Sequence, residues 1–322
     1  MSANHLPVSV IIPTYNRAGT VTLAIDSVLD QTYKHYEIIV VDDGSTDDTK
    51  QILQDRYGDA IRYIYQFNNG AAAARNTGIR ASHNELIAFL DSDDRWLPKK
   101  LEVQTSLMSD TNIILSYTNL INRINGIDDD FFSQIGLHFD TEPAILEQPL
   151  KTLLRRGGCG IWTSAVMCRK SAVERVGCFD VRMRIYEDVR LWTRLAFEGK
   201  WAVSCKPLML RIWSSPGEQL VNLQSQSYHR QSANLRLEIF MEAYAHAVNE
   251  PTDVQHKLRE FIAADLAHQA KFFALDGEYK KARRRAFEAL VFSPTREVLQ
   301  KALVALLFPQ LLPVIVKIIR RR

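Results

Sequence analysis

The first half of the chain alternates short apolar runs with helical patterns, and this alternation constrains the fold more than any other feature. Runs that suit buried strands occupy Val8 to Ile12, Tyr36 to Val41, Ile61 to Gln66 and Leu86 to Leu90. A helical pattern, Ala71 to Ala81, lies between the last two. Strands that alternate with helices are typical of a mostly parallel sheet flanked by helices. We therefore expect a Rossmann-like α/β fold.

The pattern changes along the second half of the chain. Further strands are expected at 113–117, 161–167, 201–204 and 208–212, whereas the weak periodicity and acidic run within 119–149 favour irregular structure. From about Gln219 the strand signal ends, and helices are expected at 222–247, 253–275 and 278–291, with a helical hairpin over 278–307. We therefore predict an α/β domain over 1–216 and an α-helical extension over 217–322.

Charge and cysteine content exclude several classes of protein. The formal net charge of +3 is too small for a nucleic-acid binder, although residues 251–322 hold 14 Lys and Arg against 7 Asp and Glu. The four cysteines form no C-x-x-C pair, so a zinc site is not expected and a reduced, cytoplasmic setting fits best. The polar start of the chain lacks the pattern of a signal peptide.

Polar residues follow four of the predicted strands, and ligands of open parallel sheets bind at those carboxyl ends. The residues concerned are Pro13, Thr14, Tyr15 and Asn16 after the first strand; Asp42, Asp43 and Gly44 after the second; Arg75 on the helix that follows the third; and Asp91, Ser92 and Asp93 after the Leu86 to Leu90 strand. Asp42 suits a base or ribose, although a turn with a helix cap explains the same residues. Three carboxylates in the Asp91 to Asp94 cluster favour a divalent cation over a solvated turn. Arg75 suits either a phosphate or a salt bridge.

These motifs, in this order, resemble those of family 2 glycosyltransferases, which have the GT-A fold. The resemblance implies that Thr14 and Asn16 border a nucleotide and that Asp42 holds its base. It also implies that Asp91 and Asp93 form a D-x-D element for a diphosphate-bound metal, Mn²⁺ or Mg²⁺. A UDP-sugar is the first expectation for the donor. The absence of a Q-x-x-R-W motif indicates transfer of one sugar per binding event.

The segment Tyr186-Glu187-Asp188 resembles the family's E-D segment, whose aspartate deprotonates the acceptor hydroxyl. A sugar hydroxyl is a poor nucleophile, so a positioned carboxylate is chemically needed. We assign this role to Asp188, with Glu187 as the alternative, and expect inversion at the anomeric carbon. In isolation, two acidic residues at a helix start would only indicate a favourable interaction with the helix dipole.

One departure from the family pattern leaves a second function open. Many members have a histidine near the segment 210–215, where this chain has Trp213, so Arg211 is expected to supply part of the missing charge. A catalytically inactive partner of another glycosyltransferase is therefore the alternative function. A nicotinamide-dependent oxidoreductase is disfavoured, because no G-x-G-x-x-G follows the first strand.

The C-terminal end suggests a membrane. Residues 302–316 are almost wholly apolar and are followed by Lys317 and Arg320 to Arg322, but they are too short to span a bilayer. They suit either a peripheral anchor on the inner face of the cell membrane, to which the basic run 280–285 would add, or a helix buried internally or in a homodimer. A saccharide or lipid-linked saccharide acceptor fits the first of these.

Overall fold

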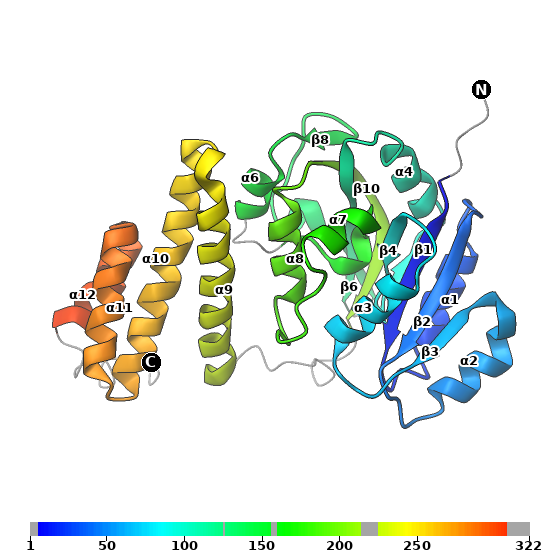
Figure 1. Ribbon diagram of the computed structural model, residues 1–322, viewed down its shortest axis with the longest axis horizontal. Helices are drawn as coiled ribbons and strands as arrows, with labels where there is room; N and C mark the ends of the chain where they lie inside the picture. Colours follow the sequence, from blue (N-terminus) through cyan, green and yellow to red (C-terminus); the bar gives the residue numbers. More distant parts are fainter. Residues whose placement is uncertain (1–5, 125, 156–159, 214–224, 308–322) are drawn as a thin grey trace. The chain divides into compact units, whose positions relative to one another are not determined.

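The computed structural model describes residues 6–124, 126–155, 160–213 and 225–307. The chain divides into two compact units, Met1–Glu218 and Gln219–Arg322 (Figure 1). The domain boundary predicted from the sequence, at 216/217, lies outside the described residues. Each unit has its own buried apolar residues, and each is described by itself.

A mixed sheet forms the centre of the first unit, in the order β3-β2-β1-β4-β9-β6-β10-β5, with β7 beside β6 and β8 beside β10. Its strands are β1 (Val8–Thr14), β2 (Tyr36–Asp42), β3 (Arg62–Tyr65), β4 (Leu86–Phe89), β5 (Arg95–Trp96), β6 (Ile113–Ile124), β7 (Ile127–Asp130), β8 (Ala144–Leu146), β9 (Val166–Arg169) and β10 (Lys200–Trp213). The β3-β2-β1-β4 half is entirely parallel, as is the β6–β10 pair. The predicted α/β class is confirmed.

Helices flank this sheet (Figure 1). They are α1 (Val21–Leu29), α2 (Thr49–Tyr57), α3 (Ala71–Ala81), α4 (Lys100–Leu107), α5 (Phe131–Gln134), α6 (Pro149–Leu154), α7 (Lys170–Arg175) and α8 (Glu187–Leu195), with 3₁₀ turns η1 (Gly58–Ala60) and η2 (Thr163–Ala165). α3 packs very closely on β1, because a Cβ at Gly78 would lie 2.3 Å from Ile11 Cγ2. Glycine at this position therefore sets how near α3 comes to the sheet.

The expectation of irregular structure over 119–149 was wrong. β6 continues to Ile124 and turns into the antiparallel strand β7, followed by α5, β8 and α6. The acidic run lies in β7, where Asp128 pairs with Arg123 across the hairpin at 2.7 Å. Phe131 and Phe132 are buried, so apolar packing orders the segment although its periodicity is weak.

Two predicted strand boundaries also differ from the structure. The strands expected at 201–204 and 208–212 are one strand, β10, which passes Pro207 through a shift of register against β6. Such an irregularity accommodates a proline that cannot donate a ladder hydrogen bond. In the predicted strand 161–167, residues 163–165 form the turn η2, and β9 begins at Val166.

The second unit is helical in its described part. It comprises α9 (Gln226–His246), η3 (Ala247–Asn249), α10 (Thr252–Leu275), α11 (Tyr279–Phe292) and α12 (Arg296–Leu307). These confirm the three predicted helices and the hairpin over 278–307, apart from residues 222–224, which lie outside the described part. Residues 308–322 of the apolar and basic end also lie outside it. Among the described helices, none is long and apolar enough to cross a membrane.

Candidate active site

The loops after β1 and β2 are joined by Asn16. Its backbone N–H donates to Ser45 Oγ (2.9 Å), and its side-chain oxygen accepts from the backbone N–H of Thr46 (2.8 Å). Asn16 has a φ of 51°, a conformation that asparagine tolerates better than most residues. The polar residues that follow β1 and those that follow β2 therefore form one surface.

Within that surface, Thr14 and Tyr15 differ in solvent exposure. Pro13 and Thr14 are buried at the end of strand β1, and Thr14 Oγ1 has no hydrogen-bond partner among the described residues. Tyr15 is 44% exposed at the rim. A buried hydroxyl without a partner is costly, so Thr14 keeps an unused polar group at the end of β1.

Asp42 is fully buried and already has two donors. Its Oδ1 accepts from the backbone N–H of Ser45 (2.8 Å) and its Oδ2 from the hydroxyl of Tyr63 (2.6 Å). Burial raises the pKa of Tyr63, and the neighbouring Asp42 carboxylate raises it further. Asp42 therefore ties the end of β2 to β3, and no sequence motif marks Tyr63 as its partner.

Asp43 organises the segment that leads into α3. Its Oδ1 accepts from Gln66 Nε2 (2.6 Å) and Asn69 N (3.0 Å), and its Oδ2 accepts from Gly70 N (2.8 Å). Gly44 has a φ of +85°, and a Cβ there would lie 2.9 Å from Asn68 N. Only glycine fits at this turn without displacing the segment.

The acidic loop after β4 is held by Ser164, a residue of η2 that the motif analysis missed. Ser164 Oγ donates to Asp94 Oδ2 (2.6 Å) and accepts from Asp91 N (3.0 Å). Trp96 Nε1 donates to the Ser164 carbonyl (2.8 Å), and this bond holds η2 in place. Burial raises the pKa of Asp94 well above its usual range, and Asp91 adds to this effect.

Asp93 is the carboxylate of this loop that faces outward. It is 41% exposed, and its nearest ion-pair partner is Arg17, at 3.8 Å. Partial burial and Asp91 raise its pKa, while Arg17 and Arg211 oppose the rise. Ser92, between the two aspartates, is buried. Asp93 is thus open to a ligand in a place where a cation would relieve repulsion.

Arg75 connects this loop to the second half of the unit. Its Nη2 donates to Asp91 Oδ1 (2.8 Å) and its Nη1 to Glu187 Oε1 (3.0 Å), and only 7% of its side chain is exposed. Burial lowers the pKa of Arg75, but Asp91 and Glu187 raise it by more. Of the two alternatives left open by the sequence, the structure shows the salt bridge.

Glu187 and Asp188 therefore have different environments. Glu187 is neutralised by Arg75, whereas Asp188 has no such cation against it among the described residues and accepts from its neighbour Val189 N (2.7 Å) and, more weakly, from Thr163 Oγ1 (3.4 Å). Burial raises the pKa of Asp188 to about 7, and the charge of Glu187 adds to the rise. A carboxylate with a pKa near neutrality is suited to accept and release a proton.

The start of α8 is positioned by contacts with α3. Asn76 donates to the carbonyl of Phe179 (2.8 Å) and accepts from its N–H (3.0 Å). The Phe179 ring packs edge-on against Phe89 and Trp192, which anchors α8 to β4. These contacts bring Glu187 and Asp188 to the acidic loop from about 100 residues further along the chain.

Arg211 is a second cation beside the acidic loop. Its guanidinium lies 3.5 Å from the centroid of the Trp162 ring. Burial lowers the pKa of Arg211 to about 10, and Asp94, Asp93 and Asp91 oppose that decrease. The side chain of Trp213 lies outside the described residues. Within the described part of the chain, no three His, Cys, Asp or Glu side chains form a metal-binding cluster by themselves.

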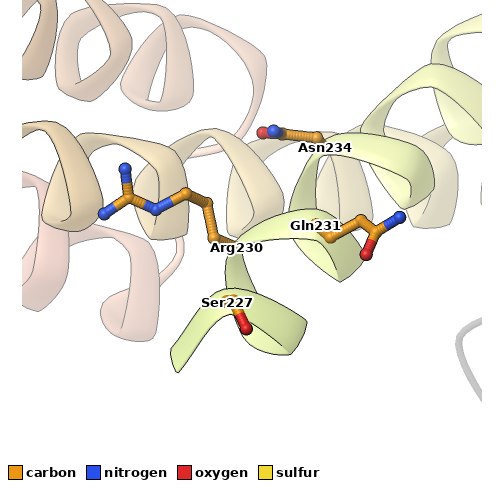
Figure 2. A pocket seen from close by; sticks show the side chains of 4 residues that line it. All are labelled: Ser227, Arg230, Gln231 and Asn234. Atoms are coloured by element: carbon orange, nitrogen blue, oxygen red, sulfur yellow. The ribbon is translucent and has the colours of Figure 1, made fainter. Parts of the chain in front are cut away.

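The second unit has a hollow of about 420 Å³ on α9, lined by Ser227, Arg230, Gln231 and Asn234 (Figure 2). Two of these side chains already serve the helical unit: Arg230 donates to Asp276 (2.9 Å), and Asn234 accepts from Gln269 (2.8 Å). The lining side chains diverge rather than converge on one point (Figure 2). The hollow is therefore not a candidate catalytic site.

The sheet and the polar strand ends together define a glycosyltransferase of the GT-A class. Residues 9–177 match the model of glycosyl transferase family 2, and the chain belongs to this family. It is 46% identical over 133 residues to an uncharacterised glycosyltransferase of Rickettsia felis, a match that covers 39% of this chain and 22% of the relative. The chain thus spans about a fifth of the length of that relative.

Other relatives carry more specific names. The chain is 42% identical over 113 residues to WfgD of Escherichia coli, named UDP-Glc:alpha-D-GlcNAc-diphosphoundecaprenol beta-1,3-glucosyltransferase; the match covers 35% of this chain and 45% of WfgD.

Solved structures share the fold. TarS 1-349 of S. aureus, in complex with UDP-GlcNAc, superposes with a TM-score of 0.63 at 17% identity, covering 96% of this chain and 86% of the 1-349 chain. The mannosyltransferase PcManGT of Pyrobaculum calidifontis, in complex with GDP-Man and Mn²⁺, gives a TM-score of 0.53 at 18% identity, covering 96% and 89%.

Proposed function

We propose that this glycosyltransferase moves a single sugar from a UDP-sugar to a hydroxyl of a saccharide acceptor, with inversion at the anomeric carbon. The observation that carries this proposal is the pair of salt bridges made by Arg75. They join Asp91 of the acidic loop to Glu187, next to Asp188. This bridge supports the proposal because it would bring the proposed donor-side carboxylate and the proposed proton acceptor into one site. The UDP-GlcNAc bound by TarS and the UDP-Glc in the name of WfgD support a uridine donor.

On the donor side, the surface formed by Thr14, Tyr15 and Asn16 would border the nucleotide, with Asp42, Asp43 and Gly44 shaping its base pocket. Asp93 and Asp91 would hold a Mn²⁺ or Mg²⁺ ion, which would neutralise the departing diphosphate. Their oxygens fit a hard divalent cation, and Asp93 is exposed and destabilised by its neighbour in the way that such an ion relieves. Arg211 would add positive charge beside the same loop.

On the acceptor side, Asp188 would take the proton of the attacking hydroxyl. The new bond forms between that oxygen and the anomeric carbon while the bond to the diphosphate breaks, so UDP leaves and the proton stays on Asp188. Attack opposite the leaving group inverts the configuration. Through its bonds to Asp91 and Glu187, Arg75 would hold the acidic loop and the proposed catalytic base at a fixed separation, and its positive charge would help to stabilise the departing diphosphate.

A lipid-linked saccharide is the proposed acceptor, because the name of WfgD specifies a diphosphoundecaprenol-linked one. Such an acceptor would place the enzyme on the inner face of the cell membrane as a peripheral protein. A catalytically inactive partner that binds UDP-sugars is the second candidate, motivated by Trp213 at the position where many family members have histidine.

Turnover of a panel of UDP-sugars with Mn²⁺ separates the two candidates. We expect transfer or slow donor hydrolysis by the wild type, and a loss of at least about a hundredfold in Asp188→Asn, because general-base catalysis contributes about that much. Asp59→Asn, an exposed carboxylate in η1, is the matched control and should match the wild type. UDP binding without turnover of any donor would instead support the inactive partner.

A further inference from the structure

The outward face of α11 carries a stripe of cationic and apolar side chains. Lys280, Arg284, Phe287 and Val291 are spaced four, three and four residues apart, which places them on one side of a helix. Phe287 is 61% exposed and Val291 60% exposed. The opposite face carries the buried alanines 282, 286 and 289. This helix therefore packs inward through small residues and presents its large apolar residues outward.

The neighbouring helix α12 also carries exposed apolar side chains. Leu303 is 41% exposed and Leu307 55% exposed, and they lie one helical turn apart. Arg283 of α11 donates to the carbonyl of Leu306 at 3.1 Å, which joins the two helices. We call the resulting patch the α11–α12 surface; it comprises Lys280, Arg283, Arg284, Phe287, Val291, Leu303 and Leu307.

The exposed apolar side chains of the second unit are concentrated on the α11–α12 surface. In the described part of the second unit, seven large apolar side chains are exposed, and four of them, Phe287, Val291, Leu303 and Leu307, belong to this surface. The three others are Met241 on α9, Val248 in η3 and Tyr279 at the start of α11. Scattered exposed apolar residues need no explanation, but a group of them indicates an interaction surface.

The charge of the surface identifies its partner. Residues 279–292 contain five Lys and Arg against the single acid Glu288, which pairs with Arg284 and Arg285. A second copy of the chain would bring two such cationic helices together, which like-charge repulsion disfavours. An anionic bilayer accepts both features, because apolar side chains enter the boundary of headgroups and acyl chains while Lys and Arg remain at the phosphates.

We propose that the α11–α12 surface docks this enzyme on an anionic lipid bilayer, with Phe287 and Val291 inserted and Lys280, Arg283 and Arg284 on the headgroups. The inference deepens the proposed function, since it gives the acceptor's membrane a binding surface on the enzyme. It places the membrane contact on the described helix α11 itself, which contains the basic run 280–285 and adds the exposed Phe287 and Val291 to it.

Sedimentation of the full chain with vesicles tests this. We expect binding to vesicles of equal parts phosphatidylcholine and phosphatidylglycerol, and much weaker binding to phosphatidylcholine alone. The double variant F287S/V291S should lower the partition coefficient at least about tenfold, since each buried apolar side chain contributes at least that much. K280Q/R283Q should lower it about fivefold for each charge.

Val248→Ser is the matched control, because it removes a side chain that is 76% exposed outside the surface. It should bind vesicles as the wild type does. Equal binding to both kinds of vesicle, or unchanged binding of both double variants, would overturn the proposal. A change in sedimentation-equilibrium mass in F287S/V291S, without vesicle binding by the wild type, would instead identify a second copy as the partner.

Vesicle binding is measured without donor or acceptor, so its outcome is independent of the proposed function. Turnover of a UDP-sugar in solution should be equal in the wild type and in both double variants. An enzyme that binds anionic vesicles but transfers no sugar would contradict the proposed function and leave the docking surface standing. Transfer without vesicle binding would do the reverse.

Discussion

Arg75 is almost wholly buried between Asp91 and Glu187, two carboxylates from distant parts of the chain. Removal of one member of such a group leaves charges without a partner in a region of low dielectric, which typically costs 3–5 kcal/mol when the group is fully buried. Because Asp91 is 33% exposed, we expect Arg75→Met to lower the free energy of unfolding by about 2 kcal/mol. Urea unfolding measures this change.

The matched control for this variant is Arg56→Met, which breaks the exposed pair with Asp26. It should cost less than about 1 kcal/mol. Arg75→Lys should also lose activity, because an ammonium group cannot bond both carboxylates in the geometry of a guanidinium. Full activity of the lysine variant would contradict the proposal that Arg75 fixes the distance between the acidic loop and the catalytic base Asp188.

As the proposed base, Asp188 would make the rate of the reaction depend on pH. Because burial raises its pKa to about 7 and only the ionised form accepts a proton, we expect kcat/KM to rise with pH and to level off above about pH 7. A pH–rate profile at fixed Mn²⁺ measures this. If kcat/KM changes by no more than about tenfold between pH 5 and pH 8, Asp188 is excluded as the base.

The same raised pKa affects stability in a direction that can be checked. Between the unfolded and folded pKa values the folded protein holds a proton that the unfolded chain has released, so stability falls as pH rises through this range. Asp188→Asn removes this effect. We expect the variant to melt at a higher temperature than the wild type at pH 8, and the difference to shrink towards pH 4.

At the scale of elements, the turn η2 supports the acidic loop after β4 through the hydroxyl of Ser164. Ser164→Ala would leave Asp94 and the N–H of Asp91 without their shared partner. We expect the Mn²⁺ concentration for half-maximal activity to rise about tenfold, a loss in the range of a charged hydrogen bond, with a smaller change in kcat. Activity titrated with Mn²⁺ measures both quantities.

Ser116→Ala is the control for that variant. Ser116 is equally buried, but its hydroxyl accepts from Gln104 and does not contact the acidic loop. It should change stability more than metal dependence. A Ser164→Ala enzyme with unchanged Mn²⁺ dependence would show that the loop keeps its geometry without the hydroxyl.

These elements also show how far the sequence could predict the site. The strands β1 to β4 and the residues after them followed from apolar runs and polar strand ends, because that half of the sheet is regular and parallel. The roles of Ser164 and Tyr63 could not be predicted, since neither lies in a motif and each acts on a residue more than 20 positions away. Similarly, the hairpin β6–β7 depends on cross-strand pairing, which weak local periodicity does not reveal.

On the scale of the whole molecule, the two compact units have separate cores. Buried residues of the first surround its sheet, whereas those of the second, such as Phe240, Leu258 and Ile262, lie between helices. All residues of the proposed donor site belong to the first unit. The proposed docking surface belongs entirely to the second, so a ligand of one unit should leave the other unaffected.

Calorimetry of the full chain tests this division. We expect two unfolding transitions, of which UDP with Mn²⁺ raises only one. A ligand at a hundred times its Kd adds about 2.7 kcal/mol to the unit that binds it, which corresponds to roughly 5–10 °C for a unit of about 200 residues. The transition that does not respond to UDP belongs to the helical unit, and anionic vesicles should affect that one instead. A single transition that moves as a whole with UDP would mean that the two cores unfold as one cooperative structure, and nucleotide and membrane binding would then be linked through folding.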